Sequence, residues 1–251
     1  MSPKTWSRGG GSGRRHAALV AALVAAVAVS AAPAPAAAAG DSVVARAKVP
    51  VVSVYRSPKA KRPFMRLSNP YRHGVPLTFL VKERRSGWER VYLPVRPNGS
   101  TGWVRDRQVD LSLTPYRIDV SLSAHTVTVW KGFRVIRRER AGVGRSIVPT
   151  PAGTYYLVEL LRQPNPNGVY GPYAFGLSAF SNVLYSFGAG PGQIGLHGTN
   201  QPWSLGTNAS HGCIRISNAG ITRLAASAAA RVEPAIRAGV RTWSKARLTS
   251  R

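Results

Sequence analysis

The chain has 251 residues, enough for one medium-sized domain or two small ones with a real hydrophobic core. Its apolar fraction of 44% excludes a disordered protein, and its single cysteine, Cys213, excludes an internal disulfide. Charge is the unusual property, because 35 Lys and Arg residues accompany only 9 Asp and Glu residues, giving a formal net charge of +26. Such a surface favours polyanions, and nucleic acid, anionic cell-wall polymers and anionic lipid headgroups are all candidates on charge alone.

Residues 1–39 have the organisation of an export signal. Arg14 and Arg15 precede an unbroken apolar run at 17–29, and three alanines at 37–39 stand before Gly40. The apolar run is short for a membrane span, and the alternative is an uncleaved anchor that holds the chain at the membrane, at least transiently. We therefore expect an exported protein of the cell wall or cell surface, with no nucleic-acid partner.

Residues 41–112 predict a small domain of short strands and turns. Valines at 49–54 favour a strand, and prolines interrupt the sequence that follows. Gly87-Trp88 and Gly102-Trp103 resemble the Gly-Trp patterns of bacterial Src-homology-3-like domains, which implies a small β-barrel over 41–112. The two tryptophans are then expected in its core, and a wall-binding face is the alternative. His73 is expected to be a solvated turn residue.

The next part of the chain, from Pro115, predicts strands joined by tight turns. Apolar residues alternate at 118–122 and recur at 127–130 and 135–136, with Gly132 between the last two runs. The Thr-Pro-Ala-Gly sequence at 150–153 predicts a bend before another strand. We further expect a long loop at 163–173 and strands at 173–177 and 182–187.

A helix is expected after Cys213, at about 219–231. Ile221, Leu224 and Ala228 recur at helical spacing, and Ser217 or Asn218 can cap the first turn. The basic residues at 237–251 are expected to form a frayed tail.

The segment from 194 to 218 concentrates the reactive side chains. His211 lies two residues before Cys213, and a thiolate beside a histidine is a nucleophile. Residues two apart in a strand project to the same side, so His211 is the expected base. The backbone N–H groups of Gly212 and Cys213 are expected to stabilise an oxyanion. No Asp or Glu lies between Glu159 and Glu233, which favours a backbone carbonyl or hydroxyl as the partner of His211.

Three other interpretations of these residues remain open. Lone cysteines are often buried small hydrophobes, although the polar neighbours of Cys213 disfavour that role. A zinc site could use His197, His211 and Cys213. Arg215 is either a surface charge or a group that shares the face of the thiol, where it would lower the thiol pKa or hold a substrate carboxylate.

These motifs and their spacing resemble the signature of one protein family. His-Gly-Thr at 197–199, Ser-His-Gly-Cys-Ile-Arg at 210–215 and Thr-Pro-x-Gly at 150–153 are similar to the signature of the L,D-transpeptidases, or YkuD-like domains. The resemblance covers 115–247. It implies a mainly β fold, a YkuD-like mixed β-sandwich with a C-terminal helix, preceded by the small N-terminal barrel.

The resemblance also implies a reaction on peptidoglycan stem peptides. The positive charge predicts further affinity for anionic wall polymers. Cys213 would attack the carbonyl of a diamino acid, release D-alanine and form a thioester, and the amine of a second stem would complete a 3→3 cross-link. His211 would act as base and then acid, while His197, Ser210, Gly212 and Arg215 would bind the substrate. No cofactor or metal is expected. Water as acceptor would give an L,D-carboxypeptidase, and a non-catalytic wall-binding protein is the third reading.

Overall fold

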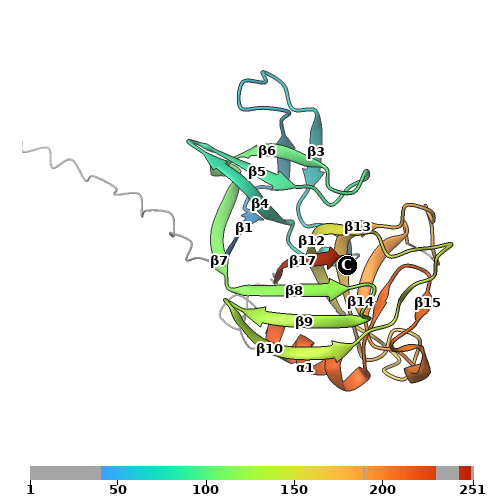
Figure 1. Cartoon of the computed structure of the whole chain (residues 1–251). Coiled ribbons are helices and arrows are strands. Elements are labelled where there is room, and N and C mark those ends of the chain that lie inside the picture. The colour runs from blue at the N-terminus through green and yellow to red at the C-terminus, as the bar shows by residue number, and fades with distance from the viewer. Residues whose placement is uncertain (1–40, 189, 230–242, 250–251) are drawn as a thin grey trace, which may run out of the picture. The chain divides into compact units, whose positions relative to one another are not determined.

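The computed structural model describes residues 41–188, 190–229 and 243–249 of the chain. The export signal expected at 1–39 lies outside the described residues. Among the residues that are described, no helix is both long and apolar enough to cross a membrane. Figure 1 shows that strands dominate, so the mainly β fold is confirmed.

The N-terminal part is built on a five-stranded antiparallel sheet in the order β6-β5-β4-β1-β7. Its strands are β1 (Ser42–Ala47), β4 (Thr78–Arg85), β5 (Trp88–Tyr92), β6 (Thr101–Arg105) and β7 (Val109–Thr114), and β2 (Val51–Val54) pairs with β3 (Met65–Ser68). Short 3-10 turns lie at η1 (Arg72–Gly74) and η2 (Asp106–Gln108). Trp88 and Trp103 are buried, as expected of core residues. The Src-homology-3-like character of this part stays a prediction.

The second part is an eight-stranded mixed sheet in the order β10-β9-β8-β17-β12-β13-β14-β16. Its strands are β8 (Tyr116–Ser121), β9 (Thr126–Lys131), β10 (Arg134–Arg140), β12 (Gly153–Arg162), β13 (Tyr173–Phe180), β14 (Gln193–His197), β16 (Ile214–Arg215) and β17 (Trp243–Thr249). The expected hairpins β8–β9–β10 are present. Two pairs in this sheet are parallel, β17 with β8 and β14 with β16. A short parallel pair, β11 (Val143–Gly144) with β15 (Asn208–Ser210), and the 3-10 turn η3 (Pro202–Ser204) lie outside it.

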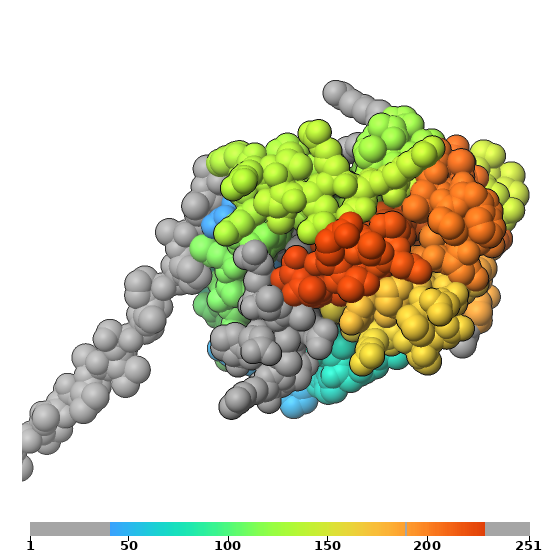
Figure 2. Space-filling model, turned by 90° about the horizontal axis from the view of Figure 1, so that it is seen from below, coloured from blue at the N-terminus to red at the C-terminus, as the bar shows by residue number. Residues whose placement is uncertain are grey.

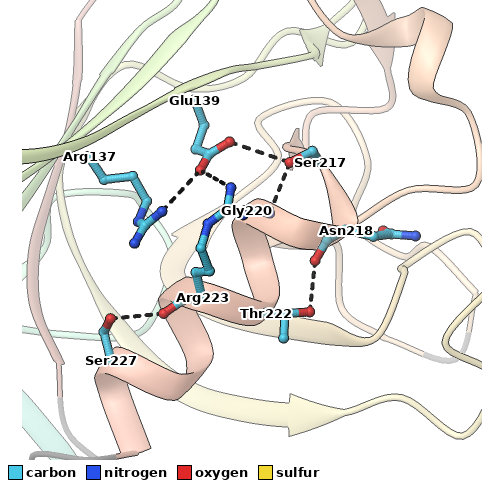
Figure 3. Close-up of polar contacts among 8 residues, drawn as sticks. All are labelled: Arg137, Glu139, Ser217, Asn218, Gly220, Thr222, Arg223 and Ser227. Carbon is cyan, nitrogen blue, oxygen red and sulfur yellow. Dashed lines mark hydrogen bonds and ion pairs between the residues drawn. The ribbon is translucent and has the colours of Figure 1, made fainter.

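The helix α1 (Asn218–Ala229) begins where the sequence predicts. Ser217 is its N-cap, because its Oγ accepts the N–H of Gly220 at 2.9 Å. Figure 3 shows the carboxylate of Glu139 on β10 reaching Ser217 and Arg223, which ties the start of the helix to the sheet. In Figure 2 the outer face of α1 is open to view. Its inner residues, such as Ile221, are buried in the core of the mixed sheet.

Two expectations of secondary structure are wrong. Residues 243–249 form β17 instead of a frayed tail, since their backbone pairs with β8 on one side and β12 on the other. Residues 182–187 form no strand, and this stretch belongs to the β13–β14 loop (181–192). Three carbonyl groups of that loop accept hydrogen bonds from Arg96, so side-chain donors replace the strand partners that a ladder would supply.

Candidate active site

The register of β14 and β16 brings the two halves of the motif together. These strands are parallel, with Leu196 opposite Ile214 and His197 opposite Arg215. Because side chains alternate along a strand, Gly195 and His197 share one face with Cys213. The N–H of Gly195 donates to Sγ of Cys213 at 3.3 Å. The nucleophile thus lies beside a backbone donor on the neighbouring strand.

Cys213 and His197 open onto the same cavity, which has a volume of about 580 Å³. The β13–β14 loop supplies one wall through Phe187 and Pro191, and Tyr170 comes from the long loop at 163–172. The long loop expected from the sequence is confirmed, between the end of β12 and the start of β13.

His197 has the properties of a general base. Its side chain is buried, and its Nδ1–H donates to the carbonyl of Gly198 at 2.5 Å, which leaves Nε2 with a free lone pair. The pKa of His197 is lowered to about 4, mainly by burial; the Gly198 hydrogen bond opposes this effect, and the positive charge of Arg215 adds to it. The ring of Tyr170 packs edge-on against it, with centroids 4.9 Å apart. His197 is therefore neutral near pH 7.

His211, the base expected from the sequence, is placed differently. Its side chain is exposed, and Nη2 of Arg145 donates to its Nε2 at 2.6 Å. A guanidinium is only a donor, so this contact occupies the lone pair of Nε2. The ring also packs against Phe187, with centroids 5.3 Å apart. Of the described residues that line the cavity around Cys213, the only histidines are His197 and His73, and His211 is not among them.

The thiol of Cys213 rests in its protonated form. Burial raises its pKa, although part of the residue remains accessible. The Gly195 N–H and the charge of Arg215 lower the pKa and offset only part of the burial effect. The sequence predicts a thiolate favoured by a neighbouring histidine, whereas the structure gives a thiol whose pKa is raised, so it could act as a nucleophile only with a base to take its proton.

The backbone around the nucleophile is held by two buried hydroxyl groups. Ser210 Oγ donates to the carbonyl of Cys213 at 2.6 Å and accepts the N–H of Gly212 at 3.1 Å. Thr150 Oγ1 donates to the carbonyl of Gly212 at 2.8 Å and accepts the N–H of Gly144 at 2.9 Å. Gly212 has a φ of +107°, which favours glycine. Ser210 and Gly212 therefore shape the turn that presents the thiol, and their expected contact with substrate stays a prediction.

Arg215 is fixed by side chains of its own protein. Its guanidinium donates to Oε1 of Gln201 at 2.8 Å and lies 3.5 Å from Oγ of Ser204. These contacts occupy the group that was expected to hold a substrate carboxylate. Its charge still lowers the pKa of both His197 and Cys213, so it acts on the site through the electrostatic field.

Several residues of the site are not predicted from the sequence. Thr150 was expected only as part of a bend, and Tyr170 and Arg145 were not expected to take part. His73 is the exposed turn residue that was expected, with its ring 59% exposed, but its Nδ1 also lies 2.7 Å from Oε2 of the buried Glu159, and both residues line the cavity. The sequence did contain a signal for two of them: Thr150 is a polar residue within a predicted bend, and Tyr170 lies between two glycines of the predicted long loop.

The cavity wall also depends on the N-terminal part of the chain. Arg96, between β5 and β6, donates to the carbonyls of Ser181, Leu184 and Pro191 in the β13–β14 loop. Asn98 exchanges two hydrogen bonds with the backbone of Phe180 at the end of β13. Arg96 and Asn98 thus hold the loop that carries Phe187.

Within the part of the chain that the structure describes, no three His, Cys, Asp or Glu side chains come together in a group that could hold a metal ion.

Comparison with known proteins shows what the second part of the chain is similar to. Residues 115–235 match the model of the YkuD family, the L,D-transpeptidase catalytic domain. Over 111 residues the chain is 37% identical to the putative L,D-transpeptidases YkuD of Bacillus licheniformis and Bacillus subtilis, covering 44% of this chain and 59% of each relative. Residues 115–235 are therefore similar to L,D-transpeptidase catalytic domains of the YkuD type, and the chain spans less than two thirds of the length of these relatives.

Solved structures that are similar to this chain include an L,D-transpeptidase from Mycobacterium smegmatis. It is 18% identical, has a TM-score of 0.38, and the match covers 67% of this chain and 80% of that one. Bd1075 of Bdellovibrio bacteriovorus has 29% identity and a TM-score of 0.34, with coverage of 45% and 43%. Both TM-scores lie below 0.5, so neither similarity bears on the assignments below.

Proposed function

We propose that this protein is an exported peptidoglycan L,D-transpeptidase that forms 3→3 cross-links through a thioester on Cys213. The observation that carries the proposal is the placement of the Cys213 thiol beside the Gly195 N–H, at a cavity shared with the neutral His197. The family match over 115–235 supports the same reaction class.

The first step is acylation. As Sγ of Cys213 attacks the carbonyl of the third stem residue, Nε2 of His197 takes the thiol proton. A carbon–sulfur bond forms and an oxyanion develops, for which the backbone N–H of Cys213 is the donor that we propose. The carbon–nitrogen bond to D-alanine then breaks, and His197 returns its proton to the leaving amine. We assign the base to His197 in place of His211, because Arg145 occupies the Nε2 of His211.

The second step transfers the acyl group. The side-chain amine of a second stem attacks the thioester carbonyl, and His197 accepts a proton from that amine. The carbon–nitrogen bond forms, the carbon–sulfur bond breaks, and His197 returns the proton to Sγ, which regenerates the thiol of Cys213. Only the acceptor separates this reaction from that of an L,D-carboxypeptidase, in which water attacks the same thioester.

Intact-protein mass spectrometry after incubation with a tetrapeptide stem tests the proposal. We expect an adduct on Cys213 with the mass of the stem less D-alanine, no adduct on Cys213→Ala, and dimeric stems when an acceptor is added. Release of tripeptide alone would identify a carboxypeptidase. Dimers formed by Cys213→Ala would refute a cysteine thioester.

The excess of positive charge supports a location at an anionic cell wall. We propose that residues 1–39 direct export and hold the chain at the membrane before any cleavage. Fractionation of cells that express the full chain, with N-terminal sequencing of the wall-associated form, tests both. A full-length cytoplasmic product would refute export.

A further inference from the structure

A row of four residues crosses the mixed sheet and forms the floor of the cavity. Glu159 on β12 pairs with Gly176 on β13, and Gly176 pairs with Gly195 on β14. Gly195 in turn donates its N–H to Sγ of Cys213. All four residues line the cavity. The floor therefore runs from a carboxylate to the nucleophile, and the two positions between them have no side chain.

The carboxylate of Glu159 leans over the first of these glycines. A Cβ at position 176 would lie 2.5 Å from Oε1, so glycine is required for the carboxylate to occupy this place. The Glu159 side chain is only 3% exposed, and its Oε2 pairs with Nδ1 of His73. Oε1 is left over the glycine floor. A carboxylate with so little access to water is a strong partner for a cation that enters the cavity.

We propose that Glu159 binds the side-chain ammonium of the diamino acid whose carbonyl Cys213 attacks. The inference rests on the proposed function and specifies the donor substrate of the same site. His73 acts as a positioning residue, because its hydrogen bond fixes the second carboxylate oxygen. Arg72, the sequence neighbour of His73, also lines the cavity, so a carboxylate on the carbon that bears the ammonium would have an opposite charge available to it.

The dimensions of the floor fit such a side chain. Directly paired residues have Cβ positions about 5 Å apart. Sγ of Cys213 lies 3.8 Å from a Cβ built on Gly195, and Oε1 lies 2.5 Å from one built on Gly176, so the two groups are within about 12 Å of each other. An extended diamino-acid side chain places its nitrogen roughly 7 Å from the carbonyl carbon, at single-bond lengths of about 1.5 Å. A hydrogen bond of ~2.8 Å from the ammonium to Oε1 and an attack distance of ~3 Å from Sγ to the carbonyl carbon account for the rest of this separation.

The test compares two tetrapeptide stems, one with a free side-chain amine and one with that amine acetylated. Acylation rates are measured by intact-protein mass spectrometry for the full chain, for Glu159→Gln and for the control Glu83→Gln. Glu83 is a carboxylate on β4 that pairs with Arg85 and Arg90. We expect acetylation to slow the unaltered protein and the control by at least about tenfold, and to have little effect on Glu159→Gln.

Circular dichroism, together with alkylation of Cys213 by iodoacetamide, which needs the thiol but no diamino acid, checks that Glu159→Gln is folded and reactive. If acetylation slows Glu159→Gln as much as the unaltered protein, Glu159 does not bind the ammonium. If that variant is unfolded or is not alkylated, the comparison of the two stems on the unaltered protein decides, and equal rates for the two stems overturn the inference. If neither stem acylates the unaltered protein, the proposed function fails instead.

Discussion

Nη2 of Arg145 donates a hydrogen bond to Nε2 of His211 across 2.6 Å. This contact distinguishes His211, the base expected from the sequence, from His197, which was expected to bind substrate. His211 is two residues from the thiol but its lone pair is engaged, whereas His197 is sixteen positions away in sequence and keeps its lone pair free at the cavity. The base that we propose is therefore the histidine farther from Cys213 along the chain.

The two histidines should differ sharply on substitution. We expect His197→Ala to slow acylation of Cys213 by about 10²–10⁴-fold, the usual contribution of a general base. His211→Ala should cause a clearly smaller loss, since it removes only the contacts to Arg145 and Phe187. Single-turnover acylation rates check this, with circular dichroism to confirm folding. The opposite ranking would restore His211 as the base.

Acid should destabilise the protein through His197. The unfolded chain takes up this proton near pH 6.5, while the folded protein, whose His197 pKa is about 4, does so only near pH 4. The free energy of unfolding therefore falls as the pH drops from 6.5 to 4, by up to ~3 kcal/mol. Urea titrations across this range should give a shallower slope for His197→Gln. Parallel slopes for the two proteins would contradict the lowered pKa.

The hydroxyl of Thr150 should matter for both stability and rate. Thr150→Val leaves the N–H of Gly144 and the carbonyl of Gly212 without their buried partner, at a cost of about 1–3 kcal/mol. Acylation should slow as well, because Gly212 directly precedes the nucleophile. Thr150→Ser keeps the hydroxyl and serves as the matched control. Denaturation and single-turnover rates that do not distinguish Val from Ser would exclude this role.

Arg96 should support substrate binding from a distance. Arg96→Ala frees three carbonyls of the β13–β14 loop, and we expect kcat/KM to fall by about tenfold, or ~1.4 kcal/mol, mainly through KM. Faster proteolysis within 181–192 should accompany the loss. Arg90→Ala is the control, since Arg90 contacts Thr101 and Glu83 and no residue of this loop. If proteolysis within 181–192 is equally slow in the two variants, Arg96 does not hold this loop in place.

Local patterns in the sequence predict much of the fold. Alternating apolar residues locate β8 and β9, and helical spacing together with Ser217 locates α1. The sequence also singles out Cys213 as the candidate nucleophile, because the residues beside it are polar and its motif is contiguous; its role as nucleophile stays a prediction. In each of these cases the information lies within a few residues of the feature.

Features that depend on distant pairing are not predicted. His197 reaches the cavity through the parallel register of β14 with β16, which no local pattern specifies. The contact of His73 with Glu159 spans 86 positions, and that of Arg145 with His211 spans 66. The strand β17 was missed because its basic composition resembles that of a solvated tail, while its backbone pairing defines it.

The position of β17 between β8 and β12 has a consequence for how the protein is made. Without residues 243–249, the hairpins β8–β10 and the strands from β12 onward have no shared ladder, and each presents an open edge of unpaired backbone groups. A nascent chain in which these residues have not yet been synthesised therefore has two sheet edges that can pair with another chain. Completion of the sheet must await a segment far along in synthesis, and until then the chain needs protection from its neighbours.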